Sequence, residues 1–68
     1  MKVGWVGTRD NYNAKVGNFI LRCEKMDTQR WWWAVVKGGS RIGSGFEGSR
    51  DDAFKIAEEF YWGTKDVQ

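Results

Sequence analysis

Few residues of this chain carry side chains that could catalyse a reaction. The sequence contains no histidine, the commonest general base and a frequent metal ligand. Its one cysteine, Cys23, alternates with the apolar residues Phe19 and Leu21, a setting typical of a buried thiol rather than a nucleophile. A single cysteine also excludes an internal disulfide and a cysteine-rich zinc site. We therefore expect no enzyme activity, no cofactor and no bound metal.

Two other groups of residues invite a chemical interpretation. Four carboxylates could be drawn as an acid–base pair: Asp51, Asp52, Glu58 and Glu59. They fall at the start and on the outer side of a predicted helix, where acidic side chains are ordinarily solvated. The glycine-rich run 38–45 lacks the Gly-Lys-Ser/Thr ending of a phosphate-binding loop, and its position after a strand predicts a hairpin. Neither group predicts catalysis.

Aromatic residues are the strongest functional signal, because they make up 16% of the chain. Trp31, Trp32 and Trp33 are consecutive, and successive side chains of a strand point to opposite faces of the sheet. One buried face cannot take all three. We assign the bulkier set to the face under the helix: Trp31, Trp33, Val35, Phe19, Leu21 and Phe46. Trp32 then lies on the opposite face, where it is available for binding.

The strands that position these residues belong to a single domain, residues 1–68. Residues 1–11 form a lead-in with a short strand near residues 3–6, and residues 12–47 alternate apolar and polar side chains as antiparallel strands do. Gly17-Asn18 and Gly38-Gly39 supply residues suited to tight turns. Glycines 43 and 45 weaken the last strand and favour a bulge there.

A C-terminal helix is predicted over residues 50–62. Ser49 is suited to cap its first turn, and Gly63 is placed to end it in the left-handed conformation, with residues 64–68 as a frayed tail. Its apolar stripe recurs at helical spacing and consists of Ala53, Ile56, Ala57 and Phe60. The predicted fold is therefore α+β, a three- to four-stranded antiparallel β-meander with one C-terminal α-helix packed on one face.

Length and charge limit the class of protein further. A chain of 68 residues makes one small domain, without room for a deep substrate cavity. The formal net charge of +2 is mildly basic and lacks the dense cationic run of a strong nonspecific DNA binder. The sequence has neither an apolar run of the roughly 20 residues that span a bilayer nor a signal-peptide pattern at its start. Together with the single cysteine, these features predict a cytoplasmic protein that contacts no membrane.

The face that carries Trp32 predicts a binding surface, and the sequence leaves its ligand open. The leading hypothesis is a protein-binding site in which Trp32 is the hot spot and its neighbours surround it: Ile20, Arg22, Ala34 and Val36. The alternative is a DNA or RNA site in which Trp32 stacks on a base and cations contact phosphates. That second site would consist of Arg22, Arg30, Trp32, Lys37 and Arg41.

Two further interpretations leave no free surface for a ligand. In one, a homodimer buries the face that carries Trp32, which would also relieve the shortage of core in so short a chain. In the other, Trp5 and Val6 of the lead-in fold back across this face and cover it. The position of the lead-in separates these interpretations from a binding site.

The spacing of the turn and core residues resembles that of small, mostly uncharacterised bacteriophage and prophage proteins. The shared pattern runs Tyr12-x-Ala14-x-x-Gly17, Phe19-x-Leu21, Trp31-x-Trp33-x-Val35, Gly39-x-x-Ile42-x-Ser44-Gly45, then Ser49-x-x-x-Ala53-x-x-x-Ala57-Glu58. The position of Trp32 is usually polar in that pattern, so this chain departs from it there. The resemblance concerns fold and origin rather than activity. Together with the predicted binding face it suggests a phage-type accessory protein of the bacterial cytoplasm that binds a host or viral protein, and inhibition of a host factor is one role such proteins take.

The order of sheet and helix is also similar to the arm-binding domains of tyrosine recombinases and, more distantly, to double-stranded RNA-binding domains. Those families imply a sheet inserted into a nucleic-acid groove and held there by basic residues. In this chain Glu24, Glu47 and the acids of the first helical turn dilute any such basic surface.

Overall fold

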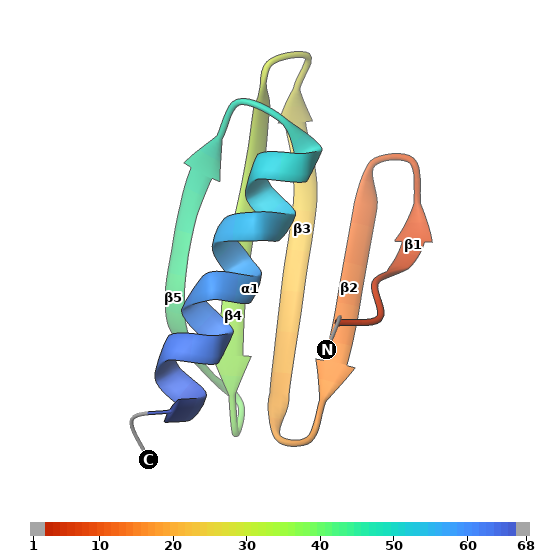
Figure 1. Ribbon diagram of the computed structural model, residues 1–68. Coiled ribbons are helices and arrows are strands. Elements are labelled where there is room, and N and C mark those ends of the chain that lie inside the picture. Colours follow the sequence, from red (N-terminus) through yellow and green to blue (C-terminus); the bar gives the residue numbers. More distant parts are fainter. Residues whose placement is uncertain (1–2, 67–68) are drawn as a thin grey trace.

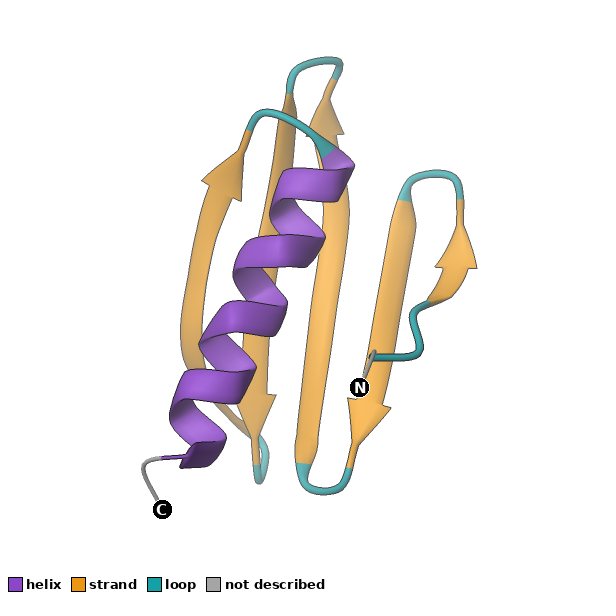
Figure 2. Cartoon of the chain, viewed as in Figure 1, coloured by secondary structure: helices purple, strands orange, loops and turns teal. Residues whose placement is uncertain are grey.

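The computed structural model of the protein describes residues 3–66. Five strands form one antiparallel sheet in the order β1-β2-β3-β4-β5, and a single helix crosses one face over β3, β4 and β5 (Figure 1, Figure 2). The elements are β1 (Val6–Thr8), β2 (Asn11–Val16), β3 (Phe19–Asp27), β4 (Arg30–Lys37), β5 (Ser40–Glu47) and α1 (Arg50–Asp66). The α+β class, the antiparallel meander and the C-terminal helix are as predicted, but the sheet has five strands rather than three to four.

The additional strand, β1, lies inside the segment predicted as a lead-in. It occupies Val6–Thr8, so the short strand predicted near residues 3–6 is displaced toward the C-terminus. Val6 pairs with Asn13 and Thr8 with Asn11, so the sheet begins before residue 12. Gly7 made this segment resemble a loop, yet the glycine is what allows the pairing. A Cβ on Gly7 would lie 2.1 Å from the Asn11 carbonyl oxygen, so only glycine lets the two strands approach this closely.

The turns between the later strands follow the sequence prediction. Gly17 has φ 59° in the two-residue turn between β2 and β3, and Gly38 and Gly39 have φ 56° and 86° between β4 and β5. These are left-handed conformations that glycine adopts without a Cβ penalty. The predicted irregularity of the last strand is also present, as a register shift opposite Val35 and Val36.

The helix begins where predicted and ends later than predicted. The backbone N–H of Asp52 donates to the Ser49 hydroxyl at 3.1 Å, which confirms Ser49 as the cap. The helix then runs through Gly63 to Asp66, so the predicted end at residue 62 is wrong, as is the left-handed role of Gly63. Of the predicted frayed tail, residues 64–66 are helical, and residues 67–68 lie outside the described residues. One glycine costs a helix only about 1 kcal/mol, which packing against the sheet can offset.

The core lies between the sheet and α1. Trp31, Trp33 and Val35 are buried there as predicted, with Leu21 from the neighbouring strand and the partly buried Phe19 packed against them. Across this layer the helix contributes two alanines and Tyr61, all buried: Ala53, Ala57 and Tyr61. Small residues on the inner side of the helix let it lie close to the bulky indoles of the sheet.

Phe46 was assigned to the core, and that assignment is wrong. It pairs with Trp32, faces away from the helix and is 56% exposed. The helix-facing positions of β5 belong to Gly43 and Gly45 instead. A Cβ on Gly43 would lie 2.4 Å from Cζ of Phe60, and a Cβ on Gly45 would lie 3.0 Å from Nε1 of Trp33. Because even a methyl group does not fit there, the phenyl ring of this strand points outward.

Val3 and Trp5 pack on the helix side of the molecule. The Trp5 ring stacks on Phe54 with centroids 4.3 Å apart, and its Nε1–H donates to Oε2 of Glu58 at 2.6 Å. Val6 is 70% exposed at the edge strand β1. The interpretation in which Trp5 and Val6 cover Trp32 is therefore wrong, and the second face of the sheet is open.

Candidate binding surface

The sheet face opposite the helix carries the candidate site, which we call the open face. Strand pairing sets its residues side by side in rows, because directly paired residues share a face. Ile20 pairs with Val36, Arg22 with Ala34, and Glu24 with Trp32, while Ser44 and Phe46 of β5 extend the second and third rows. The central part of the open face thus consists of Ile20, Arg22, Glu24, Trp32, Ala34, Val36, Ser44 and Phe46.

Two apolar cross-strand pairs lie on the open face. Trp32 and Phe46 are directly paired across β4 and β5, with Trp32 partly exposed and Phe46 largely exposed. Ile20 and Val36 form the other pair, and Ile42 at the bulge adds a further exposed apolar side chain. Single exposed apolar residues are common on proteins, but adjacent ones that form a contiguous patch are informative.

Arginines lie over both aromatic rings of this patch. The guanidinium carbon of Arg22 is 5.9 Å from the centroid of Trp32, and that of Arg30 is 5.7 Å from the centroid of Phe46. Such cation–π contacts hold the charged groups against the rings. Each arginine also has a carboxylate partner. Arg22 forms an ion pair with Glu24, and Nε of Arg30 lies 4.0 Å from Oδ2 of Asp27. The two apolar pairs are therefore separated by the row of Arg22, Ala34 and Ser44, and paired charges lie beside the aromatic rings.

All five residues predicted to bind a protein lie on the open face: Trp32, Ile20, Arg22, Ala34 and Val36. Ala34 is nevertheless 0% exposed beneath its neighbours, so it shapes the surface without reaching a partner. Sequence reasoning missed Phe46 and Ile42. The signal that could have found Phe46 is the spacing of Gly43 and Gly45, since two glycines on one face of a strand mark the side against which another element packs closely.

The residues predicted for nucleic acid are divided between the two faces. Arg22, Arg30 and Trp32 lie on the open face, and Arg41 is there too, paired with Val36. Lys37 belongs to the helix side, where its Nζ lies 5.5 Å from the centroid of Phe19. Because every second residue of a strand lies on the same face, the sequence alone places Lys37 on the face of Trp33 and Val35.

The reactive groups of the chain are placed in structural positions. Cys23 is fully buried in the core, and burial raises the pKa of its thiol to about 11, so it remains protonated at neutral pH. Across residues 3–66 no three histidine, cysteine or acidic side chains converge as metal ligands would. The one helix in that range is too short and too polar to cross a membrane.

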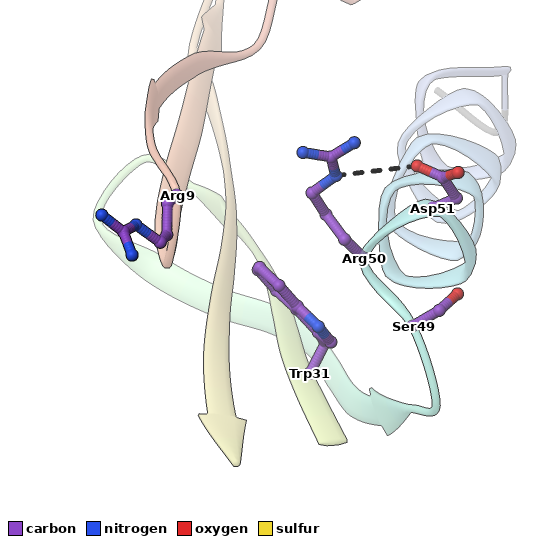
Figure 3. A pocket seen from close by; sticks show the side chains of 5 residues that line it. All are labelled: Arg9, Trp31, Ser49, Arg50 and Asp51. Atoms are coloured by element: carbon purple, nitrogen blue, oxygen red, sulfur yellow. Dashed lines mark ion pairs between the residues drawn. The ribbon is translucent and has the colours of Figure 1, made fainter. Parts of the chain in front are cut away.

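A small pocket of about 250 Å³ opens where α1 begins, and it is lined by Arg9, Trp31, Ser49, Arg50 and Asp51 (Figure 3). Its polar groups are largely engaged. The Nε of Arg50 lies 3.7 Å from Oδ1 of Asp51, and its Nη1 donates to the Tyr12 hydroxyl at 3.2 Å, a bond that raises the pKa of Arg50. Ser49 caps the helix, and Arg9 points away from the other side chains (Figure 3). We assign this pocket a structural role.

A second hollow, of about 460 Å³, separates the N-terminal segment from the outer side of the helix. It is lined by Val3, Trp5, Asp51, Phe54, Lys55 and Glu58. The stacking of Trp5 on Phe54 and its hydrogen bond to Glu58 already use the aromatic and acidic groups of this hollow. Both hollows involve the helix, so the open face is a separate surface.

Comparison with known proteins found no match, whether to protein-family models, to curated proteins or to solved structures. The function is therefore argued from the geometry of the open face.

Proposed function

We propose that this protein is a non-enzymatic binding module that engages a host or viral protein through the open face. The observation that carries the proposal is the cross-strand pair of Trp32 and Phe46, whose rings meet solvent and each have an arginine above them. Tryptophan, phenylalanine and arginine are enriched in the cores of protein interfaces, and tryptophan and arginine are frequent hot spots. Cys23 takes no part, because its thiol is buried and protonated.

The charges around the patch indicate the chemistry of the partner. By strand pairing, Lys15 and Arg41 lie on the same side of the sheet as Arg22 and Arg30, whereas acidic side chains are fewer there. The outer side of α1 carries the opposite balance, with four acids: Asp51, Asp52, Glu58 and Glu59. Since Arg22 and Arg30 already face Glu24 and Asp27, we expect a partner with an apolar patch and with carboxylates opposite Lys15 and Arg41. Complementary potentials of this kind speed and orient association.

The contacts and positions of the cationic side chains favour a protein partner over nucleic acid. Binding to phosphates depends on cations that neutralise them and release counterions. Here Arg22 and Arg30 already face the carboxylates of Glu24 and Asp27, and Lys37 lies on the other side of the sheet. Exposed aromatic rings beside paired charges suit a protein surface better than a phosphate backbone.

The biological setting that fits this proposal is a phage-type accessory protein acting in the bacterial cytoplasm. Such a protein needs one recognition surface and no catalytic site, and inhibition of a host factor requires only that the surface be occupied. The support for this setting is the spacing pattern of turn and core residues, many of which, such as Leu21, Trp33 and Ala57, form the core observed in the structure.

The proposal is tested by affinity capture from a bacterial host lysate with matched variants. Wild type and Trp32→Ala are compared with Glu59→Ala, a control on the exposed outer side of the helix. We expect one protein to be retained by wild type and by the control, and retention to fall at least tenfold with Trp32→Ala, as befits a hot spot of about 2 kcal/mol or more. Circular dichroism of each variant checks that the fold is intact.

Nuclease treatment and salt distinguish the alternative ligand. If nucleic acid is bound, retention is lost after nuclease, and the logarithm of the binding constant falls steeply with that of the salt concentration. A protein captured equally well by wild type and by a folded Trp32→Ala variant would show that the open face is not the binding site.

A further inference from the structure

The two edges of the sheet differ in how well they are protected. β1 has three residues and is followed by the charged turn Arg9-Asp10, so it offers little backbone for pairing. The other edge, β5, has eight residues and neither proline nor lysine, and it stands free at the side of the sheet (Figure 1). Its one irregularity is the bulge at Ile42, and Gly43 to Glu47 beyond it pair regularly with β4. Within residues 3–66 no strand pairs with its outer side. A long edge strand of this kind is a template for another strand.

We propose that β5 pairs with β5 of a second copy, antiparallel and about a two-fold axis at Ser44. The two sheets then become one continuous sheet with both open faces on the same side. This inference concerns the edge of the sheet and does not depend on the protein-binding role of the open face. It also differs from a homodimer that buries the open face, because Trp32 stays accessible in it.

The sequence of β5 is complementary to itself in this register. With Ser44 opposite Ser44, Gly43 lies opposite Gly45 of the second copy, and Ile42 lies opposite Phe46 of the second copy. Ile42 and Phe46 are both exposed in the single chain, and pairing covers them with each other. Since Ser44 and Phe46 point to the open face, the two-fold axis keeps like faces together, as a sheet requires.

The apolar residues of β5, rather than its charges, select this register. Arg41 pairs with Val36 on the open face and Glu47 with Trp31 on the helix side, so the two charges lie on opposite faces of the sheet. The smallest shift that keeps like faces together is two residues. It would place Phe46 opposite Ser40 or Ser44 and lose its match with Ile42.

Apolar surface also flanks this edge on the helix side. Phe60 packs directly over Gly43, which is why a Cβ there would meet its ring. Ile56 lies one turn earlier on the same side of the helix, and both side chains are partly exposed. Pairing of the β5 strands would bring the two helices side by side above the junction. Apolar surface would thus be covered on both faces of the sheet.

Sedimentation equilibrium over a range of concentrations tests the pairing. We expect a dimer for wild type, and at least about tenfold weaker dimerisation for Ser44→Lys, because two like charges would stand directly opposite each other at the axis. Asn13→Lys is the matched control, since Asn13 is also exposed and on the open face but belongs to β2. It should leave the dimer unchanged.

A charge pair in place of the apolar pair tests the register. Phe46→Lys alone should weaken the dimer about tenfold, because it removes the apolar match with Ile42 of the second copy. The double variant Ile42→Glu/Phe46→Lys should restore dimerisation to within about threefold of wild type, since opposite charges then meet across the two copies. Within one chain Ile42 and Phe46 are separated along the strand by three residues, so restoration reports contact between copies.

Disulfide trapping adds a direct readout of the axis. Ser44→Cys should form a covalent dimer rapidly under mild oxidation, because residues paired at the axis meet the distance requirement of a disulfide. Asn13→Cys should not, and buried Cys23 should not react. A protein that stays monomeric up to millimolar concentration would overturn the proposal. So would a dimer that tolerates Ser44→Lys but is lost with Trp32→Ala, because the open faces would then be the contact.

Discussion

The two faces of this sheet take aromatic side chains from the same strand and use them in different ways. On the helix-covered face Trp31 and Trp33 are 8% and 6% exposed, and their rings lie 6.4 Å from Tyr12 and 5.7 Å from Phe60 respectively. On the open face the rings of Trp32 and Phe46 meet solvent and arginine. The difference shows that the aromatic content of a strand does not decide burial. The helix decides it by covering one face.

Small residues make the covered face possible. Gly43 and Gly45 in the sheet leave space for the rings of Phe60 and Trp33, and Ala53 and Ala57 in the helix are fully buried opposite them. Close approach without a cavity is what makes such a thin core stable. The open face has no such partner in the structure, and its large side chains are bordered by charge instead. We therefore expect substitutions on the covered face to affect folding and those on the open face to affect binding.

The largest expected contrast is between two neighbouring tryptophans. Trp33→Ala should lower the free energy of unfolding by about 3–5 kcal/mol, because it removes a buried indole and leaves a cavity. Trp32→Ala should lower it by about 1 kcal/mol or less, because its ring is only partly covered. Urea denaturation followed by circular dichroism measures both. Similar losses for the two variants would mean that the faces are equally structural, and the proposed hot spot would then be a core residue.

A single methyl group should also separate packed from open positions. Gly43→Ala places a Cβ 2.4 Å from Phe60 Cζ, and we expect a loss of about 1–3 kcal/mol through overpacking. Gly48→Ala is the matched control, because no atom lies within 4 Å of the added Cβ and the backbone is not left-handed there. It should cause no loss of stability. If both variants were equally stable, the helix would pack less closely over β5 than described.

The buried thiol gives the covered face a pH dependence. Cys23 has its pKa raised from 9.0 to about 11 by burial, so the unfolded chain releases this proton first as the pH rises. The contribution of Cys23 to the free energy of unfolding is therefore fully present below pH 9. Between pH 9 and 11 this contribution is lost, by up to about 1.4 kcal/mol per pH unit. Comparing wild type with Cys23→Ala isolates this slope from tyrosine and lysine titration. Parallel pH profiles for the two proteins would contradict it.

Much of this fold could be predicted from the alternation and the turn residues, and the failures have physical causes. The division of Trp31 and Trp33 from Trp32 follows from strand geometry alone. The short strand predicted near residues 3–6 lies at Val6–Thr8 instead, because Gly7, which permits close pairing there, has the same sequence signature as a loop. Phe46 was misplaced because its strand alternates with glycines rather than with apolar residues, so no hydrophobic pattern fixed its face.

The candidate site was less predictable than the fold, because it depends on which strands lie side by side. Nothing local connects Trp32 with Phe46, which are 14 residues apart and meet only through the pairing of β4 with β5. The placement of Trp5 on Phe54 is a tertiary contact of the same kind. In contrast, the position of Lys37 on the helix side follows from the alternation of side chains along β4, in which Trp33, Val35 and Lys37 share a face. The division of the predicted nucleic-acid-binding cations between the two faces could therefore have been predicted from the sequence.

The smallest expected effect belongs to the charges of the open face. Arg22→Gln removes the ion pair with Glu24 and the contact over Trp32, yet we expect the free energy of unfolding to fall by less than about 1 kcal/mol. The arginine side chain is 46% exposed, so solvent and salt already screen the pair. Urea denaturation at low and high salt measures the change, with the neutral variant Asn13→Gln as a control on the same face. A loss of several kcal/mol would show that Arg22 helps to hold the sheet together. The open face would then contribute to stability as the helix-covered face does. A small loss in the free energy of unfolding would instead leave Arg22 available to a partner.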